Sequence, residues 1–172
     1  EIRLSLVGSE MCIRDRYSDT IEGNIAYGDS SIDLEEVEKF AKYSAASDFI
    51  SKMPEGYDTV VGERGVGLSG GQKQRISLAR ALAVRPSILI LDDTTSAVDM
   101  ETEKQIQEAL RHLDFSCTKV IIAQRISTTM MADQILVMQH GRITEMGNHE
   151  ELMAKKGYYY ELVQLQTGED LV

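Results

Sequence analysis

The sequence has little cysteine, no long apolar run and no excess of basic residues, and each of these absences excludes a class of protein. Among its 172 residues are two cysteines, Cys12 and Cys117, which are too few for a disulfide framework or a zinc site, so a reducing, cytosolic environment is expected. The longest apolar runs are as short as ILIL at 88–91, whereas a membrane helix needs about 20 apolar residues. A net charge of −10 argues against general nucleic-acid binding, so no nucleic-acid partner is expected.

The chain of 172 residues is long enough for one domain with a hydrophobic core. Its apolar pattern is typical of helices in the first half and of both strands and helices in the second half. A helix is predicted over 33–43, with Asp33 and Glu36 as its capping box, and Asn148 and Glu151 are predicted to cap a terminal helix in the same way. The other predicted elements are helices over 45–52, 71–84 and 99–113, buried strands over 87–91 and 119–124, and a hairpin over 133–147 that turns at His140-Gly141. This order predicts a three-layer α/β core with an added helical subdomain.

A short polar loop precedes the helix predicted after residue 71. It consists of Ser69, Gly70, Gly71 and Gln72. A helix start carries unpaired N–H groups and partial positive charge, glycine lets a phosphate approach the backbone, and the serine hydroxyl adds a donor. Taken alone, the loop is compatible with an anion site and equally with an ordinary loop before a helix.

Two acidic residues follow the apolar strand SILIL. Asp92 stands at its carboxyl end, where open α/β sheets bind ligands, and a carboxylate there can hold Mg²⁺ beside nucleotide phosphates. Asp93 is then placed to direct the water that attacks the terminal phosphate.

Three motifs in this order resemble those of ABC-type ATPase domains. LSGGQKQRISLARAL at 68–82 is similar to the signature motif, ILILDDTTSAVD at 88–99 to the Walker B motif with its D-loop, and IIAQRIST at 121–128 to the switch region. GERG at 62–65 resembles the X-loop of ABC exporters, and the resemblance extends over residues 17–166. It implies a P-loop NTPase-like core, ATP and Mg²⁺ as cofactors, and a second ABC ATPase domain as partner.

The resemblance also implies roles for individual residues. Ser69, Gly70, Gly71 and Gln72 would contact ATP bound to the opposite domain, and Asp92 would hold the metal. Asp93 and Gln124 would be the catalytic pair of the chain's own site. Ser96 and Asp99 would lie in the D-loop at the dimer interface, although Asp99 also suits the N-cap of the helix over 99–113. Glu63 and Arg64 would face the transmembrane part, or form a solvated charge pair.

The family's phosphate-binding motif G-x-x-x-x-G-K-[ST] does not occur in this sequence. The sequence therefore resembles the C-terminal part of the domain, and the isolated fragment is predicted to be inactive. Residues 1–16 resemble a translated sequencing adapter and are predicted to be non-native. The predicted divisions are 1–16, a helical subdomain over 17–84 with the X-loop and signature motif, and the second part of the ATPase core over 85–172.

Two positions depart from the family pattern. Asp93 stands where the family usually has Glu, which shortens the reach by about 1.5 Å, and a misplacement near 1 Å can cost on the order of a hundredfold in rate. Gln124 stands where the family usually has His, and an amide cannot take up a proton near neutral pH. Together they resemble the degenerate-site subunit of a heterodimeric exporter; a homodimer with conservative substitutions is the alternative.

The sequence thus predicts an ATPase subunit that powers export from the cytoplasmic face of the cell membrane, through a transmembrane domain of the same or an associated chain. Two alternatives remain. One is a soluble ABC-type ATPase acting on ribosomes or DNA, against which TTSAVD and GERG argue. The other is a non-catalytic regulatory domain, which Asp93 and Gln124 keep open.

Overall fold

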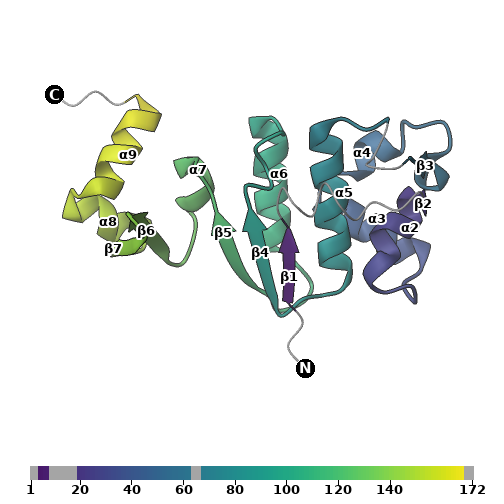
Figure 1. Cartoon of the computed structure of the whole chain (residues 1–172), viewed down its shortest axis with the longest axis horizontal. Coiled ribbons are helices and arrows are strands. Elements are labelled where there is room, and N and C mark those ends of the chain that lie inside the picture. Colours follow the sequence, from purple (N-terminus) through teal and green to yellow (C-terminus); the bar gives the residue numbers. More distant parts are fainter. Residues whose placement is uncertain (1–3, 8–18, 63–66, 169–172) are drawn as a thin grey trace. The chain divides into compact units, whose positions relative to one another are not determined.

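The computed structural model describes residues 4–7, 19–62 and 67–168, and the chain divides into two compact units, residues 1–122 and 123–172 (Figure 1). In the first unit the elements are β1 (Leu4–Val7), β2 (Asp19–Thr20), α2 (Ile21–Ile25), η1 (Ala26–Gly28), α3 (Leu34–Tyr43), α4 (Ser47–Ile50), η2 (Gly56–Asp58), β3 (Val60–Val61), α5 (Gly70–Ala83), β4 (Ile88–Asp92), α6 (Met100–Arg111) and β5 (Thr118–Ile122). In the second unit they are α7 (Ile126–Thr129), β6 (Ile135–Gln139), β7 (Arg142–Gly147), α8 (His149–Lys155) and α9 (Tyr158–Thr167). Among the described residues, none of the helices combines the length and apolar character that a membrane crossing requires.

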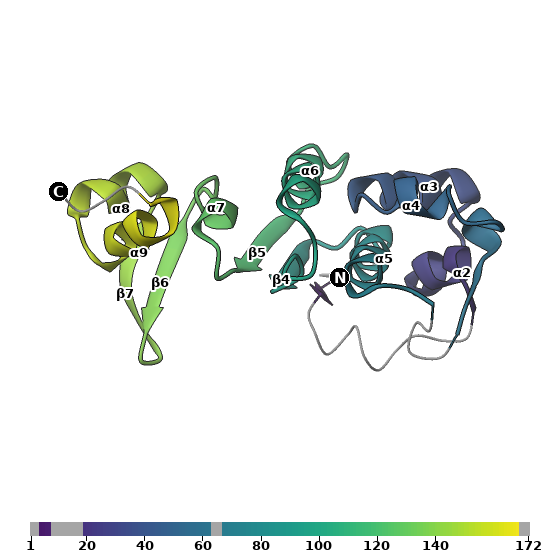
Figure 2. The same ribbon diagram turned by 90° about the horizontal axis from the view of Figure 1, so that it is seen from above.

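The first unit combines a helical group with a parallel sheet of strand order β1-β4-β5 (Figures 1 and 2). Leu89 and Leu91 of β4 are buried in one core together with Leu82 of α5 and Ile106 and Leu110 of α6. The same core continues into the helical group, where α2 and α3 contact α5. The predicted α/β fold with a helical subdomain is confirmed, and α5 lies where the two parts meet.

Helix α5 is tied to α2 by a buried polar pair. Arg80 Nε and Nη2 donate to the main-chain and side-chain oxygens of Asn24 at 2.7 and 2.6 Å, and Asn24 Nδ2 donates in turn to Thr20 O at 2.8 Å. Because a buried guanidinium must have its hydrogen bonds satisfied, this pair fixes how the two helices pack.

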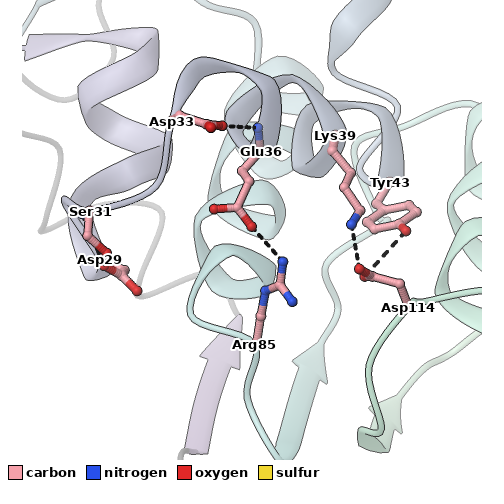
Figure 3. A network of polar contacts seen from close by, with 8 residues as sticks. All are labelled: Asp29, Ser31, Asp33, Glu36, Lys39, Tyr43, Arg85 and Asp114. Carbon is pink, nitrogen blue, oxygen red and sulfur yellow. Dashed lines mark hydrogen bonds and ion pairs between the residues drawn. The ribbon is translucent and has the colours of Figure 1, made fainter.

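Helix α3 is tied to two loops by ion pairs (Figure 3). Lys39 binds Asp114 after α6, which raises the pKa of Lys39 and lowers the pKa of Asp114. Arg85 Nη2 donates to Glu36 Oε1 at 2.5 Å. The Asp33 side chain accepts from Glu36 N at 3.0 Å and caps α3 as predicted. The predicted capping-box role of the Glu36 side chain is wrong, because its carboxylate binds the Arg85 cation instead.

Two further predictions about local structure need correction. The helix predicted over 45–52 is limited to Ser47–Ile50, and it cannot begin at Ala45, because that residue has a left-handed φ of 55°. The strand predicted over 119–124 was expected to be buried, yet Val120 and Ile122 are 45% and 53% exposed. The reason is that β5 is an outer strand of the described sheet, and these two side chains are absent from its core.

The second unit consists of the β6-β7 hairpin with three helices (Figure 2). The predicted turn is confirmed, since His140 and Gly141 both have positive φ, 50° and 76°, as a two-residue hairpin turn requires. Asn148 and Glu151 form the predicted capping box of α8. One face of the hairpin packs with the helices in a second core, whose buried members are Ile126, Ile135, Val137, Leu152, Tyr159 and Val163.

The predicted divisions of the chain remain predictions. The boundary at residues 84 and 85 falls between α5 and β4. Most of the segment 1–16 lies outside the described residues, and its β1 pairs in parallel with β4.

Candidate functional site

The loop before α5 forms a complete capping box. Ser69 is the N-cap; its Oγ accepts from Gln72 N at 3.2 Å, and Gln72 Oε1 accepts from Ser69 N at 2.8 Å. Both side chains therefore stabilise the helix start, which remains exposed at Ser69 and Gly70. The predicted anion site is thus a fixed, solvent-accessible helix N-terminus of a 14-residue helix.

The two glycines of this loop have different surroundings. A Cβ on Gly70 would meet only the Ala97 Cβ, at 3.7 Å, which is an ordinary contact. A Cβ on Gly71 would lie 2.6 Å from Ala97 O and 3.3 Å from Val98 Cγ1, and Gly71 is buried. Gly71 is therefore required by close packing of α5 against the loop after β4, whereas Gly70 leaves the backbone open toward solvent.

The predicted acidic pair lies at the carboxyl end of β4, as expected. Asp92 is the last residue of the strand, and Asp93 follows with a left-handed φ of 50°, its N–H donating to Ile122 O at 3.2 Å. Both residues are exposed. A non-glycine residue at positive φ is uncommon, although Asp tolerates it better than most, and such residues cluster at functional sites.

Two hydrogen bonds connect the loop that follows Asp93 to α5, and a third lies within the loop. Gln74 Nε2 donates to Ser96 Oγ at 3.3 Å, and Gln74 Oε1 accepts from Ala97 N at 3.2 Å. Ser96 Oγ in turn donates to Asp93 O at 3.0 Å. The structure thus brings Ser69–Gln72 and Asp93–Ala97 together in one rigid group, and Gln74 is a residue of it that the sequence analysis missed. Its spacing was a signal, because residue i+3 from Gly71 lies on the same helix face.

Asp99 is the N-cap of α6. Its carboxylate accepts from Thr102 N at 2.9 Å and from Thr102 Oγ1 at 2.8 Å, and these hydrogen bonds lower the pKa of Asp99. The N-cap prediction is confirmed; the interface role of Ser96 and Asp99 stays a prediction. Nearby, Thr95 Oγ1 donates to the buried carboxylate of Glu103 at 3.1 Å, which holds the loop to α6.

Gln124 belongs to the second unit, where its exposed position precedes α7. Its main-chain oxygen accepts from Gln166 Nε2 of α9 at 2.9 Å, and Gln166 Oε1 accepts from Ile126 N at 2.8 Å. Gln166 is the second residue that the sequence analysis missed, because its partners are 40 and 42 positions away and no periodicity connects them. Glu63 and Arg64 lie outside the described residues.

A resident metal would depend on Asp92. In the described ranges, no cluster of three or more His, Cys, Asp and Glu side chains is able to enclose a metal ion. Mg²⁺ in a nucleotide site needs no such cluster, because one or two carboxylates hold it together with water and phosphate oxygens. The exposed Asp92 offers one such oxygen donor.

Comparison with known proteins gives a consistent result. Residues 3–96, more than half of the chain, match the family model of the ABC transporter. An uncharacterized ABC transporter ATP-binding protein of Bacillus subtilis is 54% identical over 150 residues, covering 87% of this chain and 26% of that protein. An ATP-dependent lipid A-core flippase of Syntrophus aciditrophicus is 50% identical over 156 residues, covering 91% of this chain and 26% of that protein.

A solved structure shows the same relationship in three dimensions. A bacterial Atm1-family ABC exporter with ATP bound superimposes with a TM-score of 0.86 at 42% identity, covering 95% of this chain and 28% of that one. The chain therefore spans about a quarter of the length of each of these three proteins.

Proposed function

Because the chain belongs to the ABC transporter family, we propose that it is part of the ATPase domain of an exporter, in which ATP binding and hydrolysis power transport across a membrane. The observation that carries this proposal is the rigid group formed by the capped start of α5 and the loop after Asp93. This group joins Ser69–Gln72, which would bind one ATP molecule, to Asp93, which would act on a second ATP molecule. The similarity to an ATP-dependent flippase supports transport driven by ATP, and the similarity to an ABC exporter supports outward transport.

In this proposal the loop Ser69–Gln72 completes an ATP site on a second ABC ATPase domain. Gly70 leaves the backbone accessible to the phosphates, and the start of α5 supplies partial positive charge. Ser96 and Asp99 would lie at the interface between the two ATPase domains. Glu63 and Arg64 would couple the ATPase domain to the transmembrane part. The assembly would work at the cytoplasmic face of the membrane.

The chain's own site is proposed to be degenerate. Asp92 would hold Mg²⁺, which would neutralise charge on the phosphates. Asp93 would orient water, but its side chain is one methylene shorter than Glu, and Gln124 would hold the terminal phosphate without exchanging a proton. A domain with such a site works best beside a partner with a complete one, so a heterodimer is the favoured assembly.

The test uses a chimera in which residues 17–172 replace the corresponding segment of the Atm1-family ABC exporter whose structure contains bound ATP, so that the remaining parts of a working exporter are supplied. We expect slow Mg²⁺-dependent ATP turnover that is lost in Asp92→Asn. The double substitution Asp93→Glu with Gln124→His is expected to raise turnover by at least about tenfold, because a 1 Å improvement in position is worth up to a hundredfold.

Two results would argue against the proposal. Turnover that persists in Asp92→Asn would show that the chain's metal residue is not used. Turnover that the double substitution leaves unchanged would show that Asp93 and Gln124 do not limit the site. If the chimera binds nucleotide but never hydrolyses it, the chain is better described as a non-catalytic regulatory ABC domain. Asp93 and Gln124 are the residues that favour this second candidate function.

A further inference from the structure

Helix α7 begins without a cap from its own N-cap residue. Arg125 occupies the N-cap position with extended backbone, φ −91° and ψ 125°, and its side chain makes no cap hydrogen bond. The first N–H groups of any helix lack partners within the helix and need one from elsewhere. Here the Ile126 N–H finds its partner in Gln166 Oε1 at 2.8 Å, supplied by α9 from 40 positions further along the chain.

The same amide makes a second hydrogen bond on the other side of Arg125. Gln166 Nε2 donates to Gln124 O at 2.9 Å. A primary amide is suited to this double contact, because it presents an acceptor and a donor side by side in one plane. Together the two bonds hold the main chain before and after Arg125, so the dihedrals that connect Gln124 to α7 cannot turn freely.

The base of this contact is held by the core of the second unit. Val163, three residues before Gln166 on α9, is 4% exposed and belongs to the same buried cluster as Ile126, which is 7% exposed. Thr167 Oγ1 donates to Val163 O at 2.9 Å at the end of the helix. The Gln166 side chain therefore extends from a fixed helix toward the fixed start of α7, and the exposed residue that it restrains is Gln124.

We propose that Gln166 is a positioning residue for Gln124: by holding the main chain on both sides of Arg125, it sets the direction in which the Gln124 side chain leaves the backbone. The proposal rests on the proposed function, in which Gln124 holds the terminal phosphate of ATP. Gln166 touches neither nucleotide nor reacting atoms in this role and acts only through the switch.

The contact itself is tested in the 172-residue chain by amide hydrogen exchange at Ile126. Gln166→Leu removes both hydrogen bonds and is expected to speed exchange at Ile126 by about fivefold or more, since a lost hydrogen bond changes the opening equilibrium by about that factor. Gln166→Glu keeps an acceptor for Ile126 but loses the donor to Gln124 O, so it should leave Ile126 nearly as protected as the unsubstituted chain. Gln164→Leu is the matched control, because residues two apart on a helix point in different directions. Unchanged exchange at Ile126 in Gln166→Leu would overturn the proposal.

The consequence for the reaction is tested in the chimera carrying Asp93→Glu, which retains Gln124 and in which the restored Glu is expected to raise turnover. Gln166→Leu is expected to lower kcat about tenfold with the KM for ATP within about twofold, because a displaced phosphate contact matters most in the transition state. Gln166→Glu should lie between Leu and the unsubstituted chimera, and Gln164→Leu should change neither constant.

The two failures are distinguishable. If Gln166→Leu speeds exchange at Ile126 but leaves kcat unchanged, the contact only stabilises the second unit, and the positioning role is overturned while the proposed function stands. If the unsubstituted chimera turns over no ATP, the proposed function fails, and the positioning role fails with it.

Discussion

At the scale of single residues, the neighbouring Gly70 and Gly71 have different roles: Gly71 is needed for packing, and Gly70 is expected to give phosphates access to the backbone. A methyl group on Gly71 would lie 2.6 Å from Ala97 O, so Gly71→Ala is expected to destabilise the chain by about 1–3 kcal/mol, as overpacking does, even though Ala favours helices. Gly70→Ala has room for its methyl group and should unfold in urea at nearly the unsubstituted midpoint. In the chimera, however, Gly70→Ala should lower ATP turnover about tenfold, because its methyl group stands between the backbone and the phosphates. Equal stability losses in both variants would contradict this division of tasks.

At the scale of secondary-structure elements, the start of α6 depends on the charge of one exposed carboxylate. The hydrogen bonds from Thr102 lower the pKa of Asp99 in the folded chain below its unfolded value, which is near 3.9. The stability that Asp99 contributes is therefore fully present above about pH 4 and is lost as the pH falls through the folded pKa. Asp99→Ala is expected to lower the urea midpoint at pH 7, and the difference from the unsubstituted chain should shrink below pH 4.

Asp99→Asn is the control for this element, because Asn caps helices about as well as Asp without titrating. Its urea midpoint relative to Asp99→Ala should be nearly independent of pH between 3 and 7. A constant difference between the unsubstituted chain and Asp99→Ala over the same range would show that the carboxylate charge does not hold α6.

At the scale of the whole molecule, the phosphate-binding motif of the family is the missing feature that decides what this chain can do alone. No G-x-x-x-x-G-K-[ST] motif occurs in it, so the purified 172-residue chain is expected to release no phosphate from Mg²⁺-ATP above background. Asp92→Asn serves as the control for contaminating ATPases, since both proteins should then give the same background rate. Phosphate release that Asp92→Asn abolishes would overturn this expectation. Val120 and Ile122 are exposed on an outer strand of the described sheet. They predict that copies of the chain associate with one another at high protein concentration.

The local signals of the sequence were sufficient for most of the longer helices and strands, but not for the short elements such as α2 and α7. Asp33, Asp99 and Asn148 cap helices where their spacing predicted, because an N-cap bonds to an N–H three residues away and is therefore encoded locally. The apolar strand ending at Asp92 and the turn at His140-Gly141 are local in the same sense. The motif order that identified the family depends on the sequence alone.

Only the tertiary structure decided which distant groups meet. The Glu36 carboxylate binds Arg85, 49 positions away, and does not form the predicted capping box. Gln74 binds Ser96, 22 positions away, and Gln166 binds Gln124, 42 positions away. These partners depend on how helices pack against loops, and no local spacing records such distances. The exposure of β5 could not be predicted from its apolar sequence either. Apolar residues show that a strand can be buried, but the position of the strand in the sheet determines whether it is buried.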